Sequence, residues 1–282
     1  MLTRIRKLTY PSIVLLALLG HGQVYGAEAA TADPDHSYIL GVFPHLPPRE
    51  LEKVFAPMAA DLGKVLGRDV RFRSSTTYEK FSEHLHDGKY DIAFIQPFDY
   101  VAVAGNGGYV PAATRTQRLS AIIVTKNDSP LDNMESLKDK RVSLPPESAA
   151  VSILTRNHLI RNNLTPGKDV ILSHHRSHVS CMQKVLIGET DACGTAAPAV
   201  RYFQKRMKVE LKTIARTMDI PHTLFVMHTR LPERERQIIK QRILGWGESE
   251  SGRKLLERGS LKPFVNISDS DYDVVREIIK NQ

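Results

Sequence analysis

Short apolar segments alternate along this chain with amphipathic helical patterns, and this alternation constrains the fold more than any other feature of the sequence. The segment 92–95 is wholly apolar, as expected of a strand in a parallel sheet covered on both faces. After Pro48, apolar residues recur at three- and four-residue spacing as far as Leu66, which predicts a helix. Further strands are predicted at 38–43, 70–73, 109–113, 121–125, 141–144, 170–173, 191–194, 211–215 and 224–228, and further helices at 78–85, 148–162, 178–187, 197–205, 233–245 and 271–280. The pattern predicts an α/β fold with mostly parallel sheets.

In sheets of this kind, ligands collect at the carboxyl ends of the strands, where helix N-termini converge. The loops after Ile95, Leu144 and Ser173 are therefore the ones expected to form a site. With 282 residues, of which 41% are hydrophobic, the chain is long enough to bury a substantial core and is expected to divide into two lobes.

The first 26 residues have the pattern of a cleaved signal peptide. Arg4, Arg6 and Lys7 form a positively charged region, the apolar run 13–19 follows, and the segment 24–26 places small residues before a cleavage point. The apolar run is shorter than the about 20 residues that a membrane span requires. The sequence therefore predicts an exported, periplasmic protein, and an uncleaved N-terminal anchor is the alternative.

The net charge favours anionic ligands. Removal of residues 1–26 lowers the formal charge from +8 to +5, which still attracts anions by a long-range field. The basic residues are spread along the chain and the protein is expected to be exported, so nucleic acid is not a predicted partner. Cys181 and Cys193 would lie in an oxidising compartment, but two cysteines are too few for a disulfide scaffold.

The segment 174–182 gathers three histidines, Cys181 and Met182, which are all potential ligands of soft metals. His178 and Cys181 are three residues apart and can share a helix face, yet the spacing matches none of the paired zinc patterns. No metal and no other cofactor is therefore predicted. For Cys181 and Cys193 three interpretations remain open: a disulfide, two buried apolar cysteines, or a soft site for an arsenite-like ligand. No nucleophile–base motif, carboxylate pair or phosphate-binding loop indicates an enzyme.

Five segments occur in an order that resembles a known family. They are 88–101 (GKYDIAFIQPFDYV), 122–130 (IIVTKNDSP), 137–142 (LKDKRV), 177–178 (SH) and 188–192 (GETDA). Together they resemble the phosphonate/phosphite/phosphate-binding (PhnD-like) periplasmic solute-binding proteins of ABC importers. The resemblance covers nearly the whole mature chain and implies the type II periplasmic-binding-protein fold.

That fold consists of two α/β lobes joined by a two-strand hinge, with the ligand cleft between them. The resemblance implies that residues 38–121 and 222–282 form the first lobe and that residues 122–221 form the second. Alternation alone indicates the α/β class but does not indicate this discontinuous division.

The resemblance places an anion-binding turn before the helix predicted at 148–162. In the family, backbone N–H groups and three hydroxyls hold the oxyanion at the helix N-terminus. Here Ser148 matches the first hydroxyl, while Ala149 and Ala150 replace the other two and keep only their backbone donors. Glu147 would repel a dianion unless its side chain points away. A plain N-cap is the alternative role for Ser148.

Aromatic and amide groups are expected to complete the first-lobe side of the cleft. Tyr100 matches the tyrosine of the family's Pro-x-x-Tyr motif, with a buried core tyrosine as the alternative. Tyr78 follows the second predicted strand and is a second candidate for an aromatic wall. Gln96 stands at a strand end, where its amide can donate or accept a hydrogen bond.

The second lobe is expected to contribute Ser177 and His178, which match the family's Ser-His at a helix start. A capping role is the alternative for His178, and Arg176 is expected to point outward. Thr195 is a candidate hydrogen-bonding residue near the cleft, as is Thr223. No acidic residue follows Asp219 before the strand at 224, which disfavours ligands that carry an amino group.

The predicted function is the capture of a small oxyanion and its delivery to the permease of an ABC importer by a monomeric, non-enzymatic protein. Two alternatives stay open at this point. The weakened anion turn suggests a ligand-sensing partner of a membrane histidine kinase, and the cysteines suggest a metal or thiol carrier.

Overall fold

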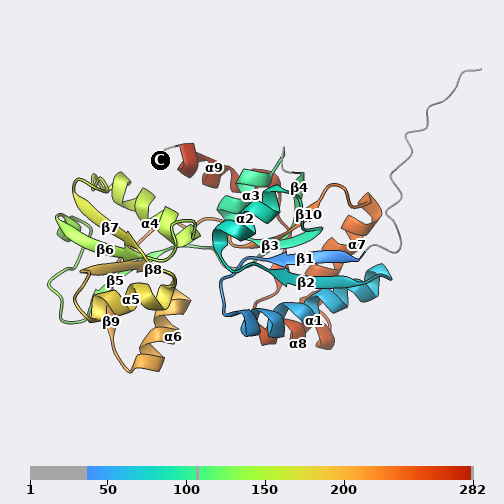
Figure 1. Ribbon diagram of the computed structural model, residues 1–282, viewed down its shortest axis with the longest axis horizontal. Helices are drawn as coiled ribbons and strands as arrows, with labels where there is room; N and C mark the ends of the chain where they lie inside the picture. Colours follow the sequence, from blue (N-terminus) through green and yellow to red (C-terminus); the bar gives the residue numbers. More distant parts are fainter. Residues whose placement is uncertain (1–36, 106–107, 281–282) are drawn as a thin grey trace, which may run out of the picture. The chain divides into compact units, whose positions relative to one another are not determined.

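The strands of the computed structural model, which describes residues 37–105 and 108–280, form two separate mixed sheets (Figure 1). The first sheet has the order β11-β4-β10-β3-β1-β2 and the second has the order β7-β6-β8-β5-β9. The strands of the first sheet are β1 (Tyr38–Val42), β2 (Val70–Ser74), β3 (Ile92–Ile95), β4 (Tyr109–Arg115), β10 (Leu224–His228) and β11 (Phe264–Val265). Those of the second are β5 (Ile122–Lys126), β6 (Lys140–Leu144), β7 (Val170–His174), β8 (Ala192–Thr195) and β9 (Leu211–Arg216). The α/β fold class is confirmed.

Helices cover both sheets (Figure 1). The first sheet is accompanied by α1 (Pro48–Leu66), α2 (Tyr78–His86), α3 (Pro97–Val103), α7 (Glu233–Leu244), α8 (Glu250–Arg258) and α9 (Asp273–Lys280). The second sheet is accompanied by α4 (Ala150–Arg161), α5 (His178–Leu186) and α6 (Ala197–Met207). Helix α1 packs against α7 and α8, and α5 packs against β6, β8 and α6.

The expectation of mostly parallel sheets was wrong. Strands β1–β2, β1–β3, β6–β7 and β6–β8 are parallel, but β10 runs antiparallel to β3 and β4, and β5 runs antiparallel to β8 and β9. The chain enters β5 and β10 directly from the other sheet, without the crossover helix that a parallel connection requires. Both sheets are therefore mixed.

Two segments, which we call the chain crossings, connect the sheets: residues 116–121 lead from β4 to β5, and residues 217–223 lead from β9 to β10. They pair with each other, since the backbone N–H and C=O of Leu119 and Ile220 exchange two hydrogen bonds of 2.9 Å. Sheet membership thus divides at residues 116–121 and 217–223, and the lobe boundaries drawn from the family resemblance stay a prediction.

Local sequence explains most element boundaries. Helix α1 starts with Pro48 in its first turn and ends at Gly67, whose φ of 67° closes a left-handed C-cap. Helix α4 begins at Ala150 rather than at the expected Ser148, because Ala149 has an extended backbone. Strand β11 and helices α3 and α8 were not predicted; α3 has only seven residues, too few for a helical period to be recognised.

The described residues contain no helix with the length and apolar character of a membrane span. The predicted signal peptide, residues 1–26, lies outside the residues that the structure describes.

Candidate functional site

Gln96 connects the first sheet to the turn in which the anion site was predicted. It is the N-cap of α3, it follows β3, and only 4% of its surface is exposed. Its Oε1 accepts a hydrogen bond of 2.9 Å from the Ala150 N–H, and its Nε2 donates to the Ser148 carbonyl oxygen at 3.3 Å. The side chain thus contacts two backbone groups of residues 148–150, which the sequence did not indicate.

The turn itself is closely packed. Ala149 is the N-cap of α4 without a side-chain cap, and its N–H donates to the Pro146 carbonyl oxygen at 2.9 Å. Ser148 is therefore not the N-cap, and its hydroxyl lies 3.3 Å from Glu79 Oε1 on α2. Ala149 and Ala150 are buried against the core of the first sheet. The Ala150 N–H at the start of α4 can therefore donate to an acceptor oxygen. In this structure the acceptor is the side-chain amide oxygen of Gln96.

In the described part of the chain, Glu147 and Arg176 are exposed and, unlike Glu79, are not seen to contact this turn. The Glu147 side chain is 77% exposed, and its closest cation is Arg156 at 4.0 Å. Arg176 is also exposed, as expected. The repulsion that Glu147 could exert on a bound dianion is therefore weakened by solvent.

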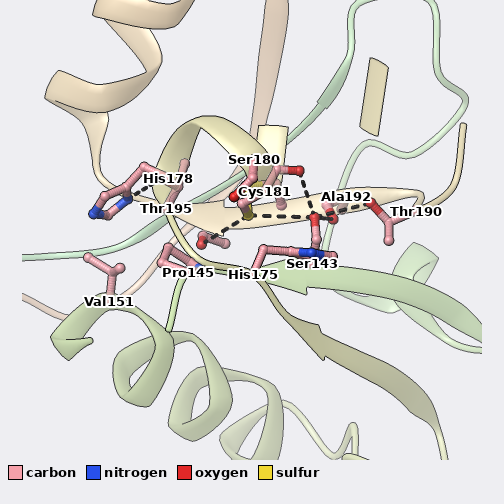
Figure 2. The surroundings of a disulfide bond; sticks show 12 residues. Ser143, Pro145, Val151, His175, His178, Ser180, Cys181, Thr190, Ala192 and Thr195 are labelled. Atoms are coloured by element: carbon pink, nitrogen blue, oxygen red, sulfur yellow. Dashed lines mark hydrogen bonds between the residues drawn. A yellow bond between two sulfur atoms is a disulfide. The ribbon is translucent and has the colours of Figure 1, made fainter. Parts of the chain in front are cut away.

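His178 lies at the first position of α5, and its Nδ1 is 2.7 Å from the hydroxyl of Thr195 at the end of β8 (Figure 2). Burial lowers the pKa of His178 to about 4, so the imidazole is neutral at pH 7. Ser177 caps α5: its hydroxyl accepts a hydrogen bond from the Ser180 N–H, and its own N–H donates to the Ser180 hydroxyl. Two predicted residues, His178 and Thr195, are thus in contact.

A disulfide joins Cys181 on α5 to Cys193 on β8, with the Cα atoms 5.8 Å apart (Figure 2). Both cysteines are fully buried. The bond excludes the two interpretations that required free thiols, a soft ligand site and a pair of reduced core cysteines. No group of three His, Cys, Asp or Glu side chains in residues 37–105 and 108–280 has an arrangement that could hold a metal ion.

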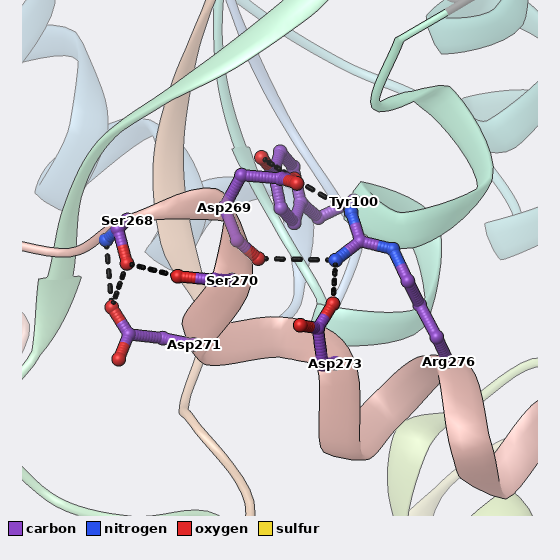
Figure 3. A network of polar contacts seen from close by, with 7 residues as sticks. All are labelled: Tyr100, Ser268, Asp269, Ser270, Asp271, Asp273 and Arg276. Carbon is purple, nitrogen blue, oxygen red and sulfur yellow. Dashed lines mark hydrogen bonds and ion pairs between the residues drawn. The ribbon is translucent and has the colours of Figure 1, made fainter.

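The two predicted tyrosines lie in different surroundings. The Tyr100 hydroxyl donates to Asp269 Oδ1 at 2.6 Å, and Arg276 forms an ion pair with the same carboxylate (Figure 3). The Tyr100 ring packs edge-on against Tyr272, with centroids 4.9 Å apart. Tyr78 is half-buried, and its ring meets that of Phe43 at 6.0 Å. Tyr100 therefore holds the C-terminal segment to α3 through its hydroxyl.

Replacing the side-chain amide of Gln96 by a carboxylate, a change of one heavy atom, should reduce the stability of the fold. We expect Gln96→Glu to lower the free energy of unfolding by about 1–3 kcal/mol at pH 7, because both Nε2 donor contacts, to the Ser148 carbonyl and to Asp99 Oδ2, would become contacts between acceptors. Nearby carboxylate raises the pKa of the new acid, so the loss should shrink as the pH falls to 5 and the acid becomes protonated. Urea unfolding at both pH values measures this, with the exposed Gln117→Glu as control.

Three basic residues were not among the predicted site residues: His45 after β1, Arg115 at the end of β4, and His222 before β10. Burial, with repulsion from Arg115, lowers the pKa of His45 to about 4 and that of His222 to about 3, and His178 also acts on His45. A cation at the end of an otherwise uncharged strand was the signal available in the sequence.

Two surface hollows, of about 300 and 340 Å³, lie beside the C-terminal half of α4. Asn157, Arg161 and Met218 line both of them. None of the predicted site residues contributes to either hollow, so they are not the predicted cleft.

Comparisons with known proteins bear on the family and the fold. The family model described as ABC transporter, phosphonate, periplasmic substrate-binding protein matches residues 40–272. No curated protein sequence matches the chain.

Among solved structures, PhnD1 from Prochlorococcus marinus in complex with methylphosphonate is similar with a TM-score of 0.76 and 18% identity, covering 88% of this chain and 98% of that one. A binding-protein component of an ABC phosphonate transporter from Pseudomonas aeruginosa gives a TM-score of 0.73 with 15% identity, covering 86% of this chain and 85% of that chain. A Xanthomonas citri protein bound to ATP gives 0.72 with 15% identity, covering 87% and 96%. At these identities the structures indicate the shared fold alone.

Proposed function

We propose that this chain, which belongs to the family of periplasmic substrate-binding proteins of ABC phosphonate transporters, captures a small oxyanion and delivers it to an ABC importer. The family consists of substrate-binding transport proteins of the periplasm. The proposed ligand is a phosphonate, phosphite or phosphate-like anion, and the proposed partner is the permease of the importer. The protein acts as a monomer in this proposal.

The observation that carries the proposal is the acceptor oxygen at the start of α4. The Gln96 Oε1 lies 2.9 Å from the Ala150 N and reaches it from the first sheet. The Ala150 N–H should bind an anionic oxygen more strongly than the neutral amide oxygen of Gln96. The reason is that the partial positive charge of the helix N-terminus adds to the hydrogen bond. A ligand oxygen that displaces Gln96 would receive this donor.

The other predicted residues fit the proposal to different degrees. Ser148, Ala149 and Ala150 would contact the ligand through the turn, and His178 with Thr195 would contact it from α5 and β8. Tyr78 would supply an aromatic wall. The Tyr100 and Ser177 hydroxyls are engaged by Asp269 and Ser180, so we propose that these two residues position the site.

Isothermal titration of the mature protein with phosphate, phosphite, methylphosphonate, sulfate, arsenite and selenite tests the oxyanion function. We expect at least one of these anions to bind with a measurable heat and to raise Tm, since a ligand at 100 times its Kd stabilises the folded state by about 2.7 kcal/mol. No heat and no Tm change with any member of the panel would exclude oxyanion capture. Co-purification with a membrane permease tests the delivery step separately, and size-exclusion chromatography tests the monomeric state.

A further inference from the structure

We propose that Arg115, with the imidazole of His222 and that of His45 beside it, forms the principal anion subsite of this protein, next to the chain crossings. This inference rests on the proposed oxyanion function. It assigns the negative charge of the ligand to a group that family resemblance did not indicate.

The backbone fixes where the Arg115 side chain goes. Arg115 is the last residue of β4, its N–H donates to the Thr223 carbonyl oxygen at 3.2 Å, and it pairs with Phe264 of β11. Side chains two residues apart on a strand, and those of directly paired residues, point to the same face. Arg115 therefore shares a face with Phe264 and with Phe225, the partner of Ala113.

That face carries a row of aromatic rings, which we call the aromatic floor: Phe43, Phe94, Phe225 and Phe264. Neighbouring centroids in it lie 4.9–6.1 Å apart. The ring of His45 stacks on Phe43 at 4.4 Å. An apolar floor lowers the local dielectric, so a charge held above it acts more strongly on a ligand than the same charge would in water.

Arg115 has no counter-ion. Its Nε is buried without a hydrogen-bond partner, and no carboxylate in the described part of the chain forms an ion pair with it. Burial lowers the pKa of its guanidinium, and no acidic side chain opposes that effect. A half-buried cation whose Nε has no partner is costly to the folded state, which makes it a candidate for a functional group rather than a structural one.

The imidazole of His222 adds a hydrogen-bond donor to the proposed subsite, and that of His45 adds a second polar ring. The Thr223 N–H donates to His222 Nδ1 at 2.7 Å, so neutral His222 carries its proton on Nε2, where it can be donated to an anion. His45 Nδ1 contacts the Phe43 carbonyl oxygen at 2.9 Å. Its ring also lies 6.2 Å from that of Phe94 in the aromatic floor. Burial, and to a smaller extent repulsion from Arg115, lowers the pKa of both imidazoles, so both are neutral at pH 7.

These groups select a chemical class of ligand. A cation beside one neutral donor, the His222 Nε2–H, and without an ion-paired carboxylate suits a small tetrahedral oxyanion, such as an alkylphosphonate or sulfate. It disfavours a ligand with an ammonium group, which would be repelled by Arg115 and would find no acidic partner. We therefore expect methylphosphonate to bind more tightly than 2-aminoethylphosphonate.

The test compares two arginines that are three residues apart in the chain. Arg115→Gln removes the proposed anchor, while Arg118→Gln removes the same charge from an exposed side chain that donates to the Asp219 carbonyl oxygen. Titration of the wild type and both variants with phosphate, sulfate, methylphosphonate and 2-aminoethylphosphonate should show a loss of about 10- to 100-fold for Arg115→Gln, the range expected for a charge-assisted hydrogen bond. Arg118→Gln should stay within about twofold of the wild type, as an exposed charge does.

The stability of the free protein separates a lost ligand contact from misfolding. Because Arg115→Gln removes a half-buried charge that has no counter-ion, the ligand-free variant should have a Tm equal to or above that of the wild type. Two results would overturn the subsite and leave oxyanion capture standing. In the first, Arg115→Gln binds the anion with the same affinity as the wild type. In the second, Arg118→Gln loses as much affinity as Arg115→Gln. If the wild type binds none of these anions, the proposed function fails and this inference fails with it.

Discussion

Replacing Asp61 by alanine should lower the free energy of unfolding by about 3 kcal/mol, the lower end of the range for breaking a buried ion pair from one side. Asp61 on α1 accepts two hydrogen bonds from Arg242 on α7, at 2.6 and 2.7 Å, and one of 2.8 Å from Trp246 Nε1. Burial raises the pKa of Asp61, but the hydrogen bonds from Arg242 and Trp246 outweigh this and lower it, so the group is ionised at pH 7. Alanine would leave the Arg242 charge and the buried indole N–H without their acceptor.

Urea unfolding monitored by Trp246 fluorescence would measure this effect, and Tm should fall by about 6–12 °C. The matched control is Asp69→Ala, whose partner Arg71 lies 2.6 Å away in an exposed ion pair. It should change the free energy of unfolding by less than about 1 kcal/mol, as surface pairs do. Equal effects in the two variants would mean that the Asp61 contacts add nothing beyond a surface pair.

Removing the disulfide is the second change with a large expected effect. The double variant Cys181→Ala/Cys193→Ala should lose about 3 kcal/mol of stability, because the bond closes a short loop, 12 residues in sequence separation, and so restricts the unfolded chain. The same bond ties α5 to β8, next to the contact between His178 and Thr195. Both sulfurs lie in the core of the second sheet, so cavity formation adds to the loss.

Urea unfolding with and without a thiol reductant provides the measurement. Reductant should lower the unfolding midpoint of the wild type towards that of the double variant and should not affect the variant itself. A wild type with two titratable thiols in denaturant before reduction would contradict the disulfide directly.

Local patterns in the sequence predicted most of the elements. The apolar segment 92–95 became β3, and the three- and four-residue spacing after Pro48 became α1. The motif order also led to the family, which the model match over residues 40–272 confirms. The direction of β5 and β10 was missed, because strand direction depends on which neighbour a strand pairs with and not on its own residues.

The candidate site was predictable only in part. Ser148, Ala149 and Ala150 were identified as a depleted anion turn, and His178 was placed correctly at the start of α5. The contact between Gln96 and Ala150 joins residues 54 positions apart, so no local pattern indicates it. Whether the nine predicted residues bind a ligand stays a prediction.

By itself the sequence determined the alternation of strands and helices, the family, and the replacement of two hydroxyls by Ala149 and Ala150. These properties depend on backbone periodicity and on residue identity, which can be read along the chain. Only the tertiary structure decided that Cys181 and Cys193 are bonded, that Gln96 contacts the turn, and that the Arg115 Nε is buried without a partner. Disulfide pairing, burial and the local dielectric all depend on neighbours from distant segments of the chain. Only the folded chain brings those neighbours together.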